Sequence, residues 1–187
     1  MPKLVTDQAV FEAVIGAVVK NGYTGATTKI IAEAAEVNEA TLFRKYGSKE
    51  QLVIKAINYL HKQAGIESLV YYSGDVRADL MRLLQRFFEG ADANEHVFMA
   101  MISEIPRHPE LIGAIQGPNQ TMMKVGRLLA RYQAEGVLKP EHPLQAVMSL
   151  IGPIVMGRML GIANPNLPLP SVDLEAHIEN YLTGRKL

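Results

Sequence analysis

Apolar residues recur at helical spacing along most of this chain, with polar residues between them. Near the N-terminus, four of them follow i, i+3, i+4, i+7 spacing: Phe11, Val14, Ile15 and Val18. Such spacing places one apolar face on a helix. Thr6 is suited to cap the start of this helix, and Asn21-Gly22 to end it. No stretch shows the two-residue alternation of a half-buried strand, so the pattern predicts an all-α protein.

The same periodicity continues to the C-terminus and predicts about nine helices. The helical stretch from Pro109 to Ala134 should break or kink at Gly117-Pro118, because a proline ring crowds the preceding turn. A helix from Pro143 to about Ile162 is apolar nearly all round, and Pro153 should bend it. Ser171 is placed to cap the last helix.

The stretch from Thr27 to Lys49, TTKIIAEAAEVNEATLFRKYGSK, predicts two short helices joined by a tight turn. The second helix begins after Asn38, a good N-cap, and places Leu42 and Tyr46 on one side. It is too short to be stable alone, so this side must pack on the first helix. The opposite side is exposed and carries Ala40, Thr41, Arg44 and Lys45. A small residue, a hydroxyl and two cations suit base edges and phosphates, which indicates a helix-turn-helix with a recognition helix.

Charge is balanced over the whole chain but not along it. The sequence has 19 basic and 19 acidic residues. From residue 44 to residue 62, five cations stand against Glu50 alone, a local excess of +4: Arg44, Lys45, Lys49, Lys55 and Lys62. Residues 64–187 have 11 basic and 13 acidic residues. The positive field is therefore local to the motif, as a small DNA-docking surface requires; the alternative is an ordinary solvated helix face.

The residues after the recognition helix form a capping box, with Ser48 at the cap and Gln51 three residues later. Lys49 lies at the N-terminus of the helix that this box opens, where backbone amides favour an anion. A lysine at this end of a helix is unfavourable for the helix dipole. We therefore expect Lys49 and these amides to hold one DNA phosphate.

The segment IAEAAEVNEATLFRKYGSKEQL resembles the DNA-binding signature of TetR-type transcriptional regulators, I-A-x-x-A-G-V-S-x-G-T-L-Y-x-H-F-x-S-K-E-x-L. The match lies within the first third of the chain. This chain departs from the signature at Glu36 and Ala40, which replace glycines, and at Phe43, Lys45 and Tyr46, which replace tyrosine, histidine and phenylalanine. Phe43 lacks the hydroxyl that the family's tyrosine gives to a phosphate. Glu36 stands where the turn usually holds glycine, so we expect it to adopt positive φ.

The motif and the resemblance together define the predicted DNA-binding domain, residues 1–48. The candidate DNA-binding residues are Thr28, Lys29, Asn38, Glu39, Ala40, Thr41, Phe43, Arg44, Lys45, Tyr46 and Lys49. Residues 49–187 are expected to form a helical effector-binding and dimerisation domain.

Methionine and phenylalanine are concentrated in the middle of the chain. These side chains either line an adaptable apolar cavity or simply fill the core. The resemblance implies an effector pocket in this helical half, and the sequence offers few clustered charges there, so we expect a small hydrophobic effector. The candidate ligand-binding residues are Phe87, Phe88, Phe98, Met101, Met122 and Met123.

The last two predicted helices carry enough apolar surface to need cover on more than one side. Gly157 and Gly161 are four residues apart and permit close approach of another helix. The resemblance implies that these helices form a four-helix interface in a homodimer; the alternative is a core within one chain. The candidate dimerisation residues are Ile154, Gly157, Arg158, Gly161, Ile178 and Tyr181.

Several other classes of protein are disfavoured. The chain has no cysteine, no HExxH and no Walker or GxSxG motif, so we expect no metal, no cofactor and no enzyme activity. Carboxylate and histidine side chains stand four apart at three places, which ordinary helix-surface pairs explain. No signal pattern and no uninterrupted apolar run of membrane-spanning length occurs, so we expect a cytoplasmic protein without membrane contact.

The sequence thus predicts an all-α transcriptional regulator with double-stranded DNA, a second copy of itself and a small hydrophobic effector as partners. We expect a repressor that binds, as a dimer, to a near-palindromic operator. The alternative is a helical protein-binding or enzymatic module whose N-terminal bundle does not bind DNA.

Overall fold

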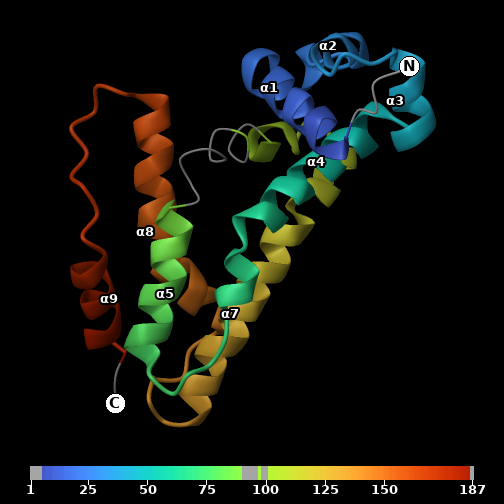
Figure 1. Ribbon diagram of the computed structural model, residues 1–187. Helices are drawn as coiled ribbons and strands as arrows, with labels where there is room; N and C mark the ends of the chain where they lie inside the picture. Colours follow the sequence, from blue (N-terminus) through green and yellow to red (C-terminus); the bar gives the residue numbers. More distant parts are fainter. Residues whose placement is uncertain (1–5, 90–96, 98–100, 186–187) are drawn as a thin grey trace. The chain divides into compact units, whose positions relative to one another are not determined.

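The computed structural model describes residues 6–89, 97 and 101–185, and within them the regular elements are helices without any strand (Figure 1). The prediction of an all-α fold is confirmed. Residues 97 and 101–104 are helical as well. The α-helices are α1 (Asp7–Gly25), α2 (Thr28–Ala34), α3 (Glu39–Tyr46), α4 (Lys49–Ala64), α5 (Val76–Glu89), α7 (Gln116–Ala134), α8 (Pro143–Ala163) and α9 (Leu174–Thr183), and the 3-10 helices are η1 (Ile66–Leu69) and η2 (Pro109–Ile115).

Short polar side chains start the N-terminal helices where the sequence predicts them. Thr6 Oγ1 accepts a hydrogen bond from the Ala9 amide at 3.3 Å, and Asn38 Oδ1 accepts one from the Ala40 amide at 2.8 Å. Each bond satisfies an amide that has no partner inside the helix. Gly22 interrupts α1 with φ 67° and ψ 173°, so the regular part of α1 ends at the predicted residue.

Two predicted boundaries in the C-terminal half are wrong. The irregularity expected at Gly117-Pro118 lies earlier, because the 3-10 helix η2 passes directly into α7 at Gln116. Pro118 falls in the first turn of α7, where a missing amide hydrogen costs no helical bond. The last helix is capped by Asp173, whose carboxylate accepts from the Ala176 amide at 3.0 Å, and not by Ser171.

The chain forms two compact units, described separately below. Unit 1 comprises residues 1–64 and 92–117, and unit 2 comprises residues 65–91 and 118–187. This division differs from the expected domain boundary after residue 48, because α4 packs closely on α1 and η2. The functional boundary at residue 48 stays a prediction.

Unit 1 holds α1 to α4 around one apolar core. The predicted apolar face of α1 is buried there, with Val14 fully covered. Leu42 and Tyr46 of α3 join this core beside residues of α2 and α4. Helix α4 contacts both α1 and α3, so it helps to hold the short α3 in unit 1.

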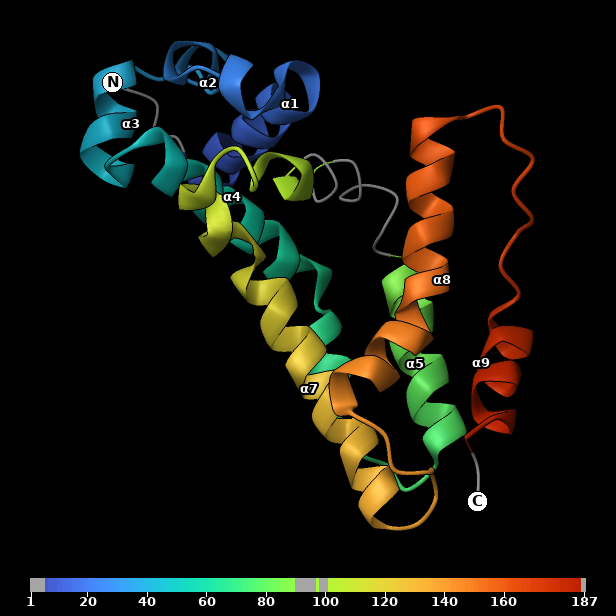
Figure 2. The same ribbon diagram turned by 180° about the vertical axis from the view of Figure 1, so that it is seen from behind.

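Unit 2 holds α5, α7, α8 and α9 around a second core. Its fully buried side chains include Leu80, Leu129, Leu150, Ile154 and Ile178. Helix α5 packs against α9 and η1, and α8 also contacts α9. Pro153 lies inside α8, and the ribbon changes direction along that helix (Figure 2). The predicted bend is therefore present.

A fully buried carboxylate lies at the start of unit 2. Asp79 accepts hydrogen bonds from the Ser73 amide at 2.9 Å, the Ser73 hydroxyl at 2.5 Å, the Tyr132 hydroxyl at 2.6 Å and Arg82 at 2.8 Å. Burial raises the pKa of Asp79, but the hydrogen bonds from Ser73, Tyr132 and Arg82 outweigh it and the net pKa is lowered. Asp79 therefore ties the segment before α5 to both α5 and α7.

We predict that Asp79→Asn lowers the free energy of unfolding by about 3 kcal/mol at pH 7, because it removes a buried charge and leaves Arg82 without its carboxylate. Since the pKa of Asp79 is lower in the folded chain, its stabilisation is complete above about pH 4 and is lost as pH falls through the folded value. The difference in free energy of unfolding between the wild type and Asp79→Asn should therefore become smaller at acid pH. Urea unfolding at one fixed protein concentration measures it.

Asp75→Asn is the matched control, because Asp75 caps α5 through the Ala78 amide and asparagine caps a helix equally well. It should change the free energy of unfolding by less than about 0.5 kcal/mol. Equal losses for the two variants would contradict a special role for Asp79.

Candidate nucleic-acid interface

The turn between α2 and α3 is tight and closed by backbone hydrogen bonds. The Val37 amide donates to the Ala32 carbonyl at 3.0 Å, and the Glu36 amide donates to the Glu33 carbonyl at 3.2 Å. Glu36 has φ 54°, which confirms the expected positive φ. A side chain in this left-handed conformation costs roughly 1 kcal/mol that glycine avoids. The turn therefore keeps the geometry of a glycine turn with a glutamate in its place.

Helix α3 divides cleanly into a buried and an exposed side. Leu42 and Tyr46 are 2% and 5% exposed and belong to the core of unit 1. Ala40, Phe43 and Arg44 are exposed, and Thr41 is half-buried at the edge between the two sides. The predicted packing of α3 on α2 is thus present, and it leaves a small residue, a ring and a cation facing outward.

The C-terminal end of α3 is anchored by a carboxylate on α1. Asp7 accepts a hydrogen bond from the Tyr46 hydroxyl at 2.6 Å and forms an ion pair with Lys45 at 2.5 Å. The hydrogen bonds from Lys45 and Tyr46 lower the pKa of Asp7. Burial and the bond to Asp7 raise the pKa of Tyr46. Tyr46 is therefore a buried anchoring residue, which argues against its predicted contact with DNA.

The other polar candidates fall into two groups. Thr28 donates a hydrogen bond to Glu39, which links the first turns of α2 and α3, and Asn38 caps α3. These three hold the motif together. Lys29 and Arg44 are exposed and form no ion pair with any residue that the structure describes. Their charges are available to an outside partner.

Lys49 has a role in unit 1 that the sequence does not reveal. Its ammonium donates to the Thr24 carbonyl at 3.2 Å and lies 4.2 Å from the centre of the Tyr23 ring. Burial lowers the pKa of Lys49. The Tyr23 ring also contacts His108 edge-on at 4.7 Å. Lys49 thus fixes the end of α1 to the start of α4, and a phosphate would have to compete with these contacts.

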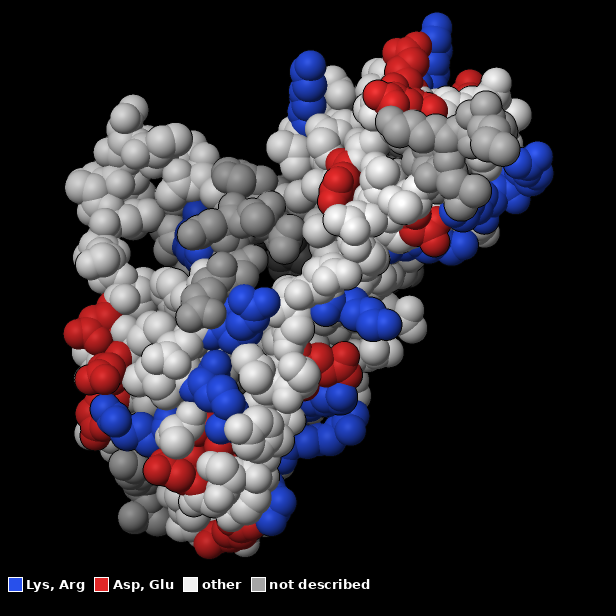
Figure 3. Space-filling view, viewed as in Figure 1, with Lys and Arg blue, Asp and Glu red and all other residues white. Residues whose placement is uncertain are grey.

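Lysine and arginine side chains gather over α3 and α4 along one edge of unit 1, with carboxylates close by (Figure 3). Of the candidates on α3, Ala40, Phe43 and Arg44 are exposed, and Thr41 lies at the edge of their surface. Asp7 is the residue that sequence reasoning missed. Its only local signal is an acidic side chain in the first turn of α1, and that signal also fits the helix dipole alone.

This geometry, two short helices with one face of the second exposed, is that of a helix-turn-helix. A family model described as "Bacterial regulatory proteins, tetR family" matches residues 17–56, which include all of α2 and α3. The HTH-type transcriptional regulator TcmR of Streptomyces glaucescens is 28% identical over 186 residues, with 93% of this chain and 81% of TcmR covered. The chain is a DNA-binding transcriptional regulator whose helix-turn-helix is similar to that of the TetR family.

Solved structures extend the likeness to the whole fold of this regulator. A TetR-family regulator from Mesorhizobium loti has a TM-score of 0.74 at 18% identity, with 97% of this chain and 96% of that chain covered. The flavonoid-responsive regulator FrrA has a TM-score of 0.72 at 19% identity, with 96% of each chain covered. Both units therefore share the fold of these TetR-family structures.

The residues expected to bind a ligand in this regulator are not all of one kind. Phe87, Phe88 and Met122 are half-buried and pack against the core of unit 2. Met101 is fully buried in the core of unit 1, and Met123 is 61% exposed. Phe98 lies outside the described residues. No single cavity lined by the five described candidates is present, so the sequence pattern did not separate pocket residues from core residues.

The residues expected at the dimer interface also divide. Ile154, Ile178 and Tyr181 are buried inside unit 2, and the Tyr181 hydroxyl donates to the Ala146 carbonyl at 3.2 Å. These three serve the core of one chain. Gly157, Arg158 and Gly161 are half-buried, and the Arg158 guanidinium lies 5.1 Å from the Phe88 ring.

Proposed function

We propose that this regulator is a cytoplasmic, dimeric repressor that leaves a near-palindromic operator when a small hydrophobic effector binds. One observation carries the DNA-binding part of the proposal. Burial of Leu42 and Tyr46 turns Ala40, Thr41 and Arg44 outward on a helix held at both ends. An arginine on an exposed helix face is the side chain that most often reads guanine in the major groove.

We predict that Arg44→Gln weakens binding to the cognate operator by about 1–3 kcal/mol and binding to random DNA by much less, because a base contact is lost. A shift assay on DNA from upstream of the chain's own coding region, at fixed salt, measures both affinities. A repressor also requires that expression of the wild-type chain lowers the output of a reporter with this upstream region.

Arg77→Gln is the matched control. Arg77 is an exposed arginine of α5 that lies near Glu175 and Glu179 of α9 at 4.0 and 3.8 Å. This variant removes the same charge from unit 2 and should bind the operator as the wild type does. Absence of any shift with the wild-type chain would favour the alternative, a helical module that does not bind DNA.

The dimer is supported by an apolar face of α8 that unit 2 leaves uncovered. Leu144, Met148, Met156, Met159 and Leu160 are each between 36% and 59% exposed. With spacings of four, eight, three and one residues, they follow one side of the helix. An exposed apolar patch of this kind marks an interaction surface. We place the dimer contact on this face, beside Gly157 and Gly161, rather than on the buried Ile154, Ile178 and Tyr181.

Helix α8 is also long and apolar enough, by length and composition alone, to cross a membrane. In its most apolar window, 22% of the residues are buried, among them core residues of unit 2. A helix of a protein core or of a subunit interface meets the same two criteria. One side of α8 is already buried in unit 2. A dimer would cover the other, exposed side.

We predict that Met156→Asp raises the dimer dissociation constant at least about a hundredfold, because it buries an unpaired carboxylate in the interface. Gly157→Leu should weaken the dimer as well. A Cβ at Gly157 meets no atom within 4 Å, so the single chain leaves room for the start of a side chain there. Sedimentation at micromolar concentration measures both.

Gly16→Leu on α1 is the control, because a Cβ at Gly16 is equally unobstructed. It should remain dimeric. A wild-type chain that sediments as a monomer would overturn the dimer.

The effector is supported by the half-buried Phe87, Phe88 and Met122 of unit 2 and by the relatives. FrrA, which has the same fold, is a flavonoid-responsive regulator. Adaptable methionine and aromatic side chains accommodate an apolar guest by repacking. A guest releases DNA only if it prefers a dimer conformation whose recognition helices no longer match successive major grooves.

We predict that N-phenyl-1-naphthylamine, a neutral apolar dye, binds less tightly when operator DNA is present. A coupling of about 1–3 kcal/mol changes both affinities by the same factor, roughly 5 to 150. Dye fluorescence titrated with and without operator gives that factor. Equal dye affinity in the two titrations would show that dye binding is not coupled to DNA binding.

A further inference from the structure

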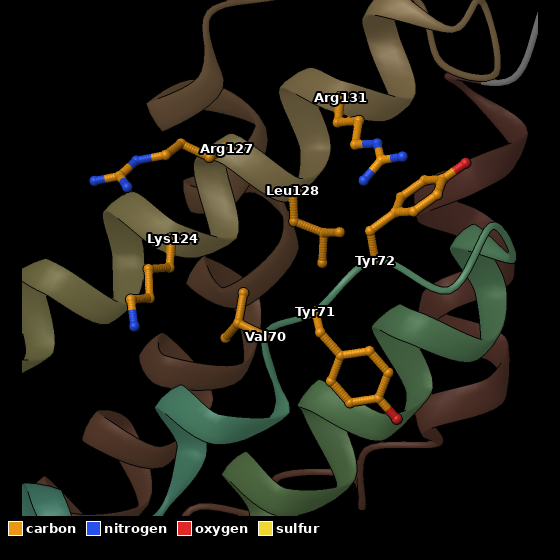
Figure 4. A pocket seen from close by; sticks show the side chains of 7 residues that line it. All are labelled: Val70, Tyr71, Tyr72, Lys124, Arg127, Leu128 and Arg131. Carbon is orange, nitrogen blue, oxygen red and sulfur yellow. The ribbon is translucent and has the colours of Figure 1, made fainter.

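A hollow on the surface of unit 2 lies where the segment before α5 crosses α7. Its volume is about 230 Å³. The lining residues are Val70, Tyr71, Tyr72, Lys124, Arg127, Leu128 and Arg131. Figure 4 shows Val70 and Leu128 facing each other at its centre, with the two tyrosine rings on one side and the side chains of Lys124 and Arg127 on the other. The hollow therefore has an apolar floor between an aromatic side and a cationic side.

Both tyrosine rings are held in place by arginines. The Arg82 guanidinium lies 3.6 Å from the centre of the Tyr71 ring, and the Arg131 guanidinium lies 3.4 Å from that of Tyr72. The Tyr72 ring also contacts the buried Tyr132 ring, at 4.9 Å between the ring centres. Stacked guanidinium groups stabilise ring faces, so these rings have little freedom to turn.

The backbone beneath the rings is fixed as well. Arg82 donates to the Leu69 carbonyl at 3.1 Å and to the Tyr71 carbonyl at 2.8 Å, while the buried Asp79 holds Arg82 and Ser73. These bonds order residues 69–73 before any ligand arrives. A site that is already ordered loses less entropy when it binds.

The cations around the hollow are not equally available. Lys124 forms an ion pair with Glu67, and Arg131 forms one with Glu135 at 3.0 Å. Tyr72 also directs its hydroxyl to Glu135, at 2.6 Å. Arg127 forms no hydrogen bond or ion pair with any described residue. The hollow thus carries one positive charge that its own carboxylates do not balance.

We propose that this hollow is a binding site for a small anion on a flat apolar body, a carboxylate or phosphate ester attached to an aromatic ring. The Arg127 guanidinium matches either anion with a two-pronged hydrogen bond. The ring rests on Val70 and Leu128 against Tyr71, where an aromatic guest replaces water over an apolar floor. This site is independent of the half-buried Phe87, Phe88 and Met122 that support the hydrophobic effector.

The volume of the hollow indicates the size of its ligand and the affinity with which that ligand binds. About 230 Å³ is below the 300–1,000 Å³ or so of most pockets for drug-sized ligands. A two-ring compound is therefore about the size that this hollow can cover. Its dissociation constant should be about millimolar, because a guest of so few atoms in an open site gains little binding free energy.

The test is a titration of the full chain with 2-naphthoate, 2-naphthyl phosphate and the neutral 2-naphthamide, followed by backbone amide NMR. At least one anion should shift the amides of residues 70–72 and 124–131, and the tighter of the two identifies the natural head group. The amide should bind about fivefold more weakly than that anion, since it lacks the charge that Arg127 meets.

Three variants make the test specific. Arg127→Gln should weaken the preferred anion about fivefold and leave the amide unchanged, and Arg127→Lys should keep part of the anion's affinity. Arg77→Gln removes an arginine elsewhere in unit 2 and should change nothing. The proposal is overturned if anion and amide bind equally, if Arg127→Gln binds the anion as tightly as wild type, or if the shifts centre on Phe87, Phe88 and Met122. Each of these outcomes leaves the DNA-binding proposal untouched, because that proposal rests on α3.

Discussion

The function of this regulator depends on the burial of two side chains on a helix of eight residues. An isolated helix of that length is not stable in water. Leu42 and Tyr46 supply the apolar contacts that hold α3 in unit 1, and Asp7 holds its C-terminal end through Tyr46 and Lys45. The exposed face of α3 exists as a surface only because its other face is buried. A loss of this packing would remove DNA binding without touching a single contact residue.

In unit 2, a buried polar group likewise orders a segment at the surface. The buried Asp79 collects hydrogen bonds from Ser73, Arg82 and Tyr132 and so fixes the segment that leads into α5. Arg82 in turn holds the Tyr71 ring at the edge of the surface hollow. Asp79 holds Arg82, and Arg82 donates to the Leu69 and Tyr71 carbonyls of that surface segment. The buried charge therefore connects the folding of unit 2 to the proposed anion-binding hollow.

Local features of the fold were predictable from the sequence, and features set by distant packing were not. The caps at Thr6 and Asn38 and the positive φ at Glu36 depend on neighbouring residues, so a linear pattern contains them. Helix α8 is apolar nearly all round, and such a helix gives no sign of which side is covered by its own chain. Ile154 was for this reason expected at an interface and lies in the core. Likewise, Lys49 contacts Thr24, which is 25 positions away, and Tyr23. The spacing of residues along the sequence does not reveal these contacts.

DNA bound to the exposed face of α3 should shield that face from solvent, and the absence of cysteine from the sequence allows this shielding to be measured directly. Ala40→Cys places one thiol on that face, and Gln85→Cys places one on an exposed position of α5. The rate of alkylation by iodoacetamide is measured with and without operator, at a concentration where all of the protein is bound. We expect operator to slow the alkylation of Ala40→Cys and to leave the alkylation of Gln85→Cys unchanged. An unchanged rate for Ala40→Cys in the fully bound complex would contradict DNA binding through the exposed face of α3.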